Sequence, residues 1–191
     1  SPDTDATPDP TYATGHTNSI KDLSNNEILD GGTVTTTDAA KPAIVSAATD
    51  DSNNDGSVDQ LILTFSEAVD VTDGNAGDGL PCITLSTGTI INGNYATSGT
   101  TLTLNLTPIA GTSVTINPTY NTAGDGSIAD KVSPTPNEMA NGETVTGTDG
   151  AKPVLMTSSM ADANADGKVE TITLTYSETL TANGVGGDDD V

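Results

Sequence analysis

Parts of this chain repeat at a fixed distance along the sequence. The letters DAAKP at residues 38–42 return as DGAKP at 149–153, an offset of 149 − 38 = 111 residues. The letters FSE at 65–67 return as YSE at 176–178, again at 176 − 65 = 111. A constant period without gaps is the signature of similar structural units arranged in series. We therefore expect the chain to fold as copies of one unit of about 111 residues.

The repeat is out of phase with the chain: the sequence starts and ends within a unit, not at a unit boundary. Upstream, the letters PTY at 10–12 return at 118–120, an offset of 118 − 10 = 108, and the offset becomes 111 again after three extra residues near 133–136. We expect three parts. They are the C-terminal part of a unit (1–37, with a Pro- and Asp-rich start at 1–10), a complete unit (38–148) and the N-terminal part of a further unit (149–191).

Short runs of alternating apolar and polar residues predict β-strands, and Gly, Asn and Asp clusters between them predict turns. Seven short strands in about a hundred residues favour an immunoglobulin-like β-sandwich, and no helical period competes. The predicted fold class is all-β, built from tandem sandwich units. The expected strands of the complete unit lie near residues 43–47, 60–65, 83–86, 89–95, 101–106, 113–116 and 143–147.

Two acidic loops occupy equivalent positions in the repeat, and both place oxygen-bearing groups at every second residue around a glycine. Side-chain oxygens at positions 1, 3 and 5, a backbone carbonyl at position 7 and a carboxylate at position 9 form the pattern by which loops surround Ca²⁺. A metal-free turn rich in Asn and Asp would use the same residues. The candidate ligands are Asp51, Asn53, Asp55, Ser57 and Asp59 in the first loop and Asp162, Asn164, Asp166, Lys168 and Glu170 in the second.

These loops depart from the helical EF-hand pattern. Position 12 is Ile62 in the first loop and Thr173 in the second, where an EF-hand would place a bidentate Glu. Residues 60–65 and 171–176 alternate as strands do. The prediction is a calcium ion held at the mouth of a β-strand, without a second helix.

Net charge restricts the partners of this chain. Lys and Arg total 5 against 27 Asp and Glu, which gives a formal charge of −22. Such a chain repels nucleic acid and anionic lipid, and it has no apolar run long enough for membrane insertion. Cys82 is the only cysteine, so an intrachain disulfide is impossible and calcium is the expected cross-link.

Further acidic residues leave two interpretations open. Glu67 and Glu178 follow the core aromatic residue of each copy. They are either additional calcium ligands, together with Asp38 or Asp149 at the junction between units, or solvated strand ends. An enzyme is not expected, because His16 is the sole histidine and no nucleophile has a base nearby in sequence.

The order of motifs carries a family resemblance. A D-x-A-x-P start, a first strand, an acidic loop and a TFSEAVD strand at 64–70 resemble the bacterial immunoglobulin-like repeats of surface-layer proteins, adhesins and other exported chains. The resemblance covers nearly the whole chain with loose motifs. It implies an extracellular or cell-surface structural role, calcium-dependent rigidity, and partners that are copies of the chain or neighbouring repeats. It carries over no catalytic residue.

Three hypotheses follow for function. In the first, the chain is part of a filament, stalk or surface layer, and the tail of one subunit is completed by the head of the next. The unit completed in this way would lack the counterpart of residues 81–107. Truncation of a longer chain would equally explain why the repeat is out of phase with the chain. The second is an adhesin module that binds a glycan or host protein, and the third is a passive domain of a secreted enzyme.

Overall fold

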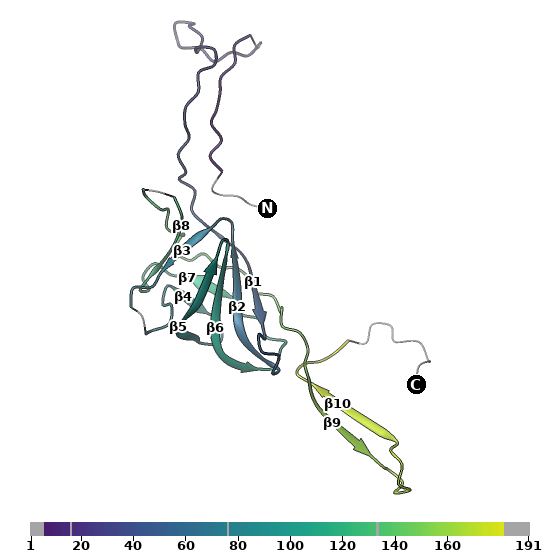
Figure 1. Ribbon diagram of the computed structural model, residues 1–191. Coiled ribbons are helices and arrows are strands. Elements are labelled where there is room, and N and C mark those ends of the chain that lie inside the picture. Colours follow the sequence, from purple (N-terminus) through teal and green to yellow (C-terminus); the bar gives the residue numbers. More distant parts are fainter. Residues whose placement is uncertain (1–5, 16, 76, 133, 182–191) are drawn as a thin grey trace.

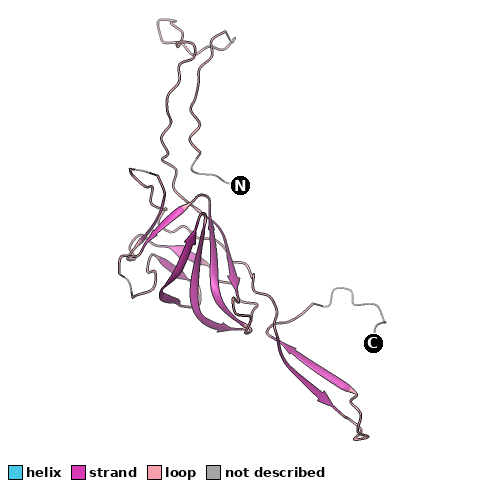
Figure 2. Ribbon diagram, viewed as in Figure 1, coloured by secondary structure: helices cyan, strands magenta, loops and turns pink. Residues whose placement is uncertain are grey.

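A computed structural model of the chain describes residues 6–15, 17–75, 77–132 and 134–181. His16, residues 1–5 of the predicted first part and residues 182–191 of the predicted last part lie outside it. The described residues form ten β-strands and no helix (Figure 2). A central body carries a long N-terminal arm on one side and a two-stranded hairpin on the other (Figure 1). The all-β prediction is confirmed.

The body contains three antiparallel sheets that together are β-sandwich-like. The largest has four strands in the order β1-β2-β6-β5, and the other two have two strands each. The four-stranded sheet consists of β1 (Ile44–Asp50), β2 (Ser57–Phe65), β6 (Thr101–Ala110) and β5 (Ile90–Ser98). The smaller sheets pair β3 (Val69–Thr72) with β8 (Ser127–Asp130), and β4 (Ile83–Leu85) with β7 (Pro118–Tyr120).

Alternation along the central strands builds the core. Leu61 faces Leu104 and Leu63 faces Leu102 across the β2–β6 pair, and all four side chains are fully buried. Burying one such leucine contributes roughly 1.5–3 kcal/mol. From the opposite side come the buried side chains of Ile83, Ile116, Tyr120, Ile128 and Met139. The core therefore lies between the large sheet and the smaller pairs.

Two of the predicted strands, at 113–116 and 143–147, are wrong. Neither segment forms a strand, and the second makes only one isolated backbone bridge, Thr144 with Thr119. Side-chain hydrogen bonds hold both segments instead of a continuous ladder: Thr49 Oγ1 donates to the carbonyl of Val114 at 2.9 Å, and the Gly147 N–H donates to Asn117 Oδ1 at 2.8 Å. Strands β7 and β8 were not predicted for the complete unit.

The C-terminal hairpin pairs β9 (Leu155–Ala161) with β10 (Thr171–Tyr176). Its register is that of β1 with β2, shifted by 111 residues: Leu174 faces Ser158 as Leu63 faces Ala47. Even the bulge is shared, at Thr175/Tyr176 and at Ile44/Ser46. Ile172 and Leu174, the counterparts of buried Leu61 and Leu63, are 64% and 46% exposed.

The N-terminal arm, residues 6–15 and 17–37, is an extended loop closed by isolated bridges such as Thr11 with Thr33. Tyr12 Oη donates to Glu27 Oε1 at 2.7 Å and accepts the Ile20 N–H at 3.1 Å. The body repeats this at an offset of 108 to 111, where Tyr120 Oη donates to Glu138 Oε1 at 2.7 Å and accepts the Ile128 N–H at 3.3 Å. The arm thus has the local bonding of the body without its burial.

Candidate metal sites

The first acidic loop joins β1 to β2 and is closed by its own side-chain oxygens. Asp51 is buried, and its carboxylate accepts the N–H groups of Asp55 at 3.2 Å and Gly56 at 2.8 Å. Asn53 Oδ1 also accepts the Asp55 N–H, at 2.9 Å, and Asp55 Oδ1 accepts that of Ser57, at 3.0 Å. Gly56, at φ 86°, permits the turn. These bonds fold the chain into a tight turn around the buried Asp51 carboxylate.

The second loop, between β9 and β10, has the same bonds. Asp162 accepts the N–H groups of Asp166 at 3.2 Å and Gly167 at 2.8 Å, and Asp166 Oδ1 accepts that of Lys168 at 3.0 Å. The positive φ angles also agree, 58° at Asn54 against 60° at Ala165. The backbone of each loop is therefore dictated by its own residues and does not depend on the core beneath it.

The ninth position distinguishes the two loops. Carboxylate oxygens of Asp162, Asp166 and Glu170 lie within 4.8 Å of one another and could hold a metal ion. Among the described residues, the corresponding carboxylates of the first loop do not gather in this way. Both oxygens of Asp59 are taken, by the Ser52 N–H at 2.9 Å and the Ser52 hydroxyl at 2.8 Å.

Ala163 replaces Ser52 in the second copy and brings no hydroxyl. Its N–H donates to Glu170 Oε2 at 2.7 Å, and Glu170 is one methylene longer than Asp59. The longer side chain reaches the other two carboxylates while holding the backbone bond. The structure thus brings together the acidic ligands of the second loop but leaves Asp59 apart in the first.

The first loop also contacts the C-terminal hairpin. A Cβ built on Gly56 would collide with the Met156 side chain and lie 3.3 Å from Ser177 Cβ. Beside it, Thr112 Oγ1 and Ser177 Oγ share a hydrogen bond of 2.7 Å. The loop between β1 and β2 therefore lies where the body meets the hairpin.

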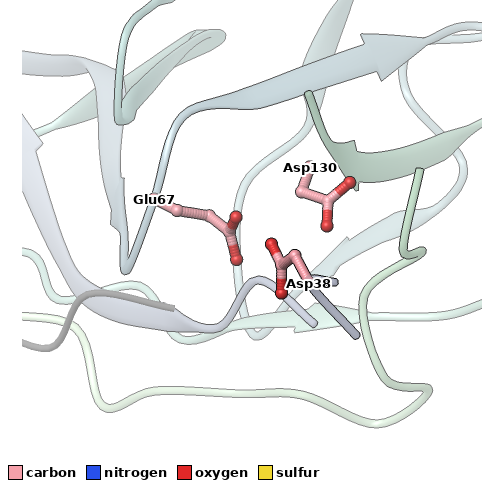
Figure 3. A group of neighbouring side chains, drawn as sticks. All are labelled: Asp38, Glu67 and Asp130. Atoms are coloured by element: carbon pink, nitrogen blue, oxygen red, sulfur yellow. The ribbon is translucent and has the colours of Figure 1, made fainter. Parts of the chain in front are cut away.

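A third acidic group lies at the opposite end of the body. Asp38, at the base of the arm, Glu67, after β2, and Asp130, at the end of β8, bring carboxylate oxygens within 4.8 Å of one another (Figure 3). Glu67 is 3% exposed and Asp130 is fully buried. Asp38 and Glu67 were one of the two interpretations left open by the sequence, but Asp130 was not predicted, because it reaches them through the β3–β8 pairing.

The counterparts of two of these residues also lie together beside the hairpin. The pKa of Asp149 is raised, first because partial desolvation and then because the Glu178 carboxylate disfavour its charged form. The counterpart of Asp130 at the 108-residue offset is Asp22, in the arm. Asp22 accepts N–H groups from Ser24 at 2.9 Å and Asn26 at 2.8 Å, as Asp130 does from Val132 and Asn137.

A hollow in the arm has a volume of about 410 Å³. Its walls include Tyr12, Ile20, Ile28 and Val34. The residues one repeat later, Tyr120, Ile128, Met139 and Val145, belong to or pack against the core of the body. The hollow is therefore lined by the counterparts of residues that belong to or pack against the core of the body.

No family model, curated protein or solved structure matches this chain. In the part of the chain that the structure describes, no helix is long and apolar enough to cross a membrane.

Proposed function

We propose that this protein is a structural component of a bacterial cell surface or extracellular filament, built from calcium-stiffened immunoglobulin-like repeats that associate head to tail. One observation carries the proposal. The arm and the hairpin expose the apolar side chains whose counterparts form the core of the body. Two exposed surfaces that are parts of one core are complementary to each other.

The hairpin offers the β1–β2 half of that core. Ile172 and Leu174 stand where Leu61 and Leu63 pack, and Met160 beside them is 71% exposed. The strand register that aligns these side chains is already formed. Docking would therefore bury a surface that is already folded. The hairpin would lose less conformational entropy on docking than an unfolded segment would.

The arm offers the opposite half. Its hollow is lined by Tyr12, Ile20 and Ile28, and the Tyr12 hydroxyl already holds the loop from Ile20 to Glu27. The occupant we propose is the hairpin of a second copy of this chain. Because the two surfaces differ, each contact leaves one arm and one hairpin unused, so the assembly grows as an open fibre.

Calcium supplies the stiffness in this proposal. The acidic groups of the second loop and of Asp38, Glu67 and Asp130 could hold metal ions, and Ca²⁺ prefers such oxygen ligands. Extracellular calcium modules bind at roughly 10⁻⁴ to 10⁻³ M, so an extracellular medium would fill them. The first loop, at the contact with the hairpin, would then fix the angle between successive units.

Deletion of residues 1–37 tests the association. The core, from Ile44 to Ala151, does not include the arm, so the shortened chain should remain folded. In millimolar calcium we expect the full chain to sediment as polymers and the shortened chain as monomers. The variant Ile172→Thr should also stay monomeric, whereas Thr173→Ser, on the other face of β10, should polymerise. Polymers that persist after the deletion, or a full chain that remains monomeric, would reject head-to-tail association.

An adhesin module remains the alternative. It would need an exposed aromatic site, and the aromatic side chains of Phe65, Tyr95 and Tyr120 belong to or pack against the core. The hollow beside Tyr12 is the remaining candidate surface for a foreign ligand. The adhesin would be favoured if the chain forms no polymers, binds to a glycan array, and loses this binding in the variant Tyr12→Ala.

A further inference from the structure

The acidic group at the base of the arm is unusual in its burial. Asp130 is fully buried and Glu67 is 3% exposed, yet both are acidic residues in a chain of charge −22. Carboxylates are seldom fully buried unless they are paired, because removing a charge from water costs several kcal/mol. Three of them within 4.8 Å also repel one another. Asp38, the third member, is half-buried, and the charge that it shares with Asp130 needs a compensating partner.

Lysine does not compensate it at Asp38 or Asp130. Within the described ranges, neither carboxylate forms an ion pair with a lysine, and nearby Lys131 pairs with Asp70 at 3.3 Å on the surface. Asp130 is held by neutral donors alone. These are the N–H groups of Val132 and Asn137 and the side-chain amide of Asn137, at 3.2, 2.8 and 2.7 Å.

One oxygen of the group has no partner at all. Asp38 Oδ1 accepts the Ala40 N–H at 2.8 Å, but Oδ2 is buried and forms no hydrogen bond. Leaving a buried charged oxygen unsatisfied costs more than the 1–3 kcal/mol typical of a neutral group. In Figure 3 the carboxyl groups of Asp38, Glu67 and Asp130 converge on one region. The unsatisfied oxygen and the convergence of three carboxylates therefore indicate that the missing partner is a cation.

We propose that Asp38, Glu67 and Asp130 bind one divalent cation, calcium, at the start of the unit. Ca²⁺ sits about 2.3–2.6 Å from its oxygen ligands, so two ligands of one ion are separated by no more than about 5 Å. The observed spacing satisfies this limit. Carboxylates from the segment before β1, the turn after β2 and the end of β8 also suit the tolerant geometry of calcium better than the strict octahedron of magnesium.

A calcium ion at this site would cross-link segments that are distant in the sequence. It joins the residues that precede β1 to the turn after β2 and to the end of β8, which lie 29 and 92 residues away (67 − 38 = 29; 130 − 38 = 92). Such a ligand set does not exist in the unfolded chain, so calcium binding stabilises the fold by mass action. The site is independent of the two acidic loops and of head-to-tail association, since all three ligands belong to one complete unit.

The test uses the full chain carrying Asp55→Asn and Asp166→Asn, which remove a charged ligand from each loop, and Ile172→Thr, which keeps the chain monomeric so that no calcium site is shared between copies. Thermal unfolding in 0.15 M NaCl is measured in EDTA and in millimolar calcium, and calcium binding by calorimetry. We expect calcium to raise the Tm of this background and to bind at one strong site per chain. Adding Asp38→Asn or Glu67→Gln should abolish both effects. The control, exposed Asp78→Asn, removes the same charge elsewhere and should preserve them.

The EDTA measurement separates a metal site from a hydrogen-bonded network. Without calcium, neutralising Asp38 relieves repulsion, so Asp38→Asn should melt at the same temperature as the background or higher. A lower Tm of Asp38→Asn in both conditions, or a calcium response that survives Glu67→Gln, would overturn the proposal. A response to magnesium equal to that to calcium would overturn the assignment of the ion.

Discussion

Single side chains decide how the two acidic loops differ. Their backbones have the same bonds and the same positive φ angles, so the loop shape depends on the shared Asp, Asn and Gly residues. What changes is position 2, Ser52 or Ala163, and position 9, Asp59 or Glu170. The Ser52 hydroxyl donates to Asp59 Oδ2 and would compete with a metal ion for it, whereas Ala163 has no hydroxyl to compete for Glu170. Calcium should therefore bind the second loop more tightly than the first.

Exchanging position 2 tests this difference. A hydrogen bond to a charged group contributes about 1.5–3 kcal/mol, which corresponds to roughly tenfold or more in affinity. Ser52→Ala should strengthen calcium binding at the first loop by about that factor, and Ala163→Ser should weaken it at the second. Calorimetry measures the calcium affinity of each loop while the other loop is disabled by Asp166→Asn or Asp55→Asn. Equal affinities before and after both exchanges would show that the hydroxyl does not compete.

Because of Cys82, we expect the body to become less stable as the pH rises into the alkaline range. Desolvation by burial is the largest cause that raises the pKa of the Cys82 thiol to about 11, and burial also raises the pKa of Tyr120. The neutral thiol favours the folded state, so its contribution is complete below the ordinary thiol pKa of about 9 and is lost as the pH rises toward 11.

We expect the Tm to fall between pH 9 and pH 11, and Cys82→Ala to reduce this fall. The variant also removes a small buried side chain, so only the slope with pH is compared. A slope that is identical in both proteins would contradict the assignment to Cys82.

At the scale of elements, β9–β10 shows what the sequence determines locally. It has the register and bulge of β1–β2 although its apolar face is exposed, so turn residues and alternation suffice to build the hairpin. For this reason β1, β2, β5, β6 and the positions of both loops could be predicted. The segments at 113–116 and 143–147 could not, because Thr49 and Asn117 bind them from distant parts of the chain. Asp130 was missed for the same reason.

The contact between the first loop and the hairpin gives a matched pair of variants. Gly56 and Gly167 have φ angles of 86° and 85°, so alanine costs about 1 kcal/mol of backbone strain at either. Only at Gly56 does the added Cβ meet Met156, since a Cβ built on Gly167 meets no described atom within 4 Å beyond its chain neighbours. Gly56→Ala should shift the Met156 methyl resonance and Gly167→Ala should not. An unmoved resonance in Gly56→Ala would exclude the contact.

At the scale of the whole molecule, association and calcium binding should be coupled. When the arm of one copy docks on the hairpin of the next, Asp22 should join Asp149 and Glu178 as Asp130 joins Asp38 and Glu67. Asp22→Asn would then weaken polymerisation in calcium more than in magnesium, while exposed Asp78→Asn would have no effect. Sedimentation at several calcium concentrations measures this, and equal losses in both ions would exclude a shared site.

The central claim is that calcium stiffens units which complete one another between molecules. The most direct measurement is electron microscopy of the full chain in millimolar calcium and in EDTA, with thermal unfolding of the same samples. We predict straight filaments and a higher Tm in calcium, and slack or dissolved filaments with a lower Tm in EDTA. Identical images and equal melting temperatures in both solutions would contradict this account.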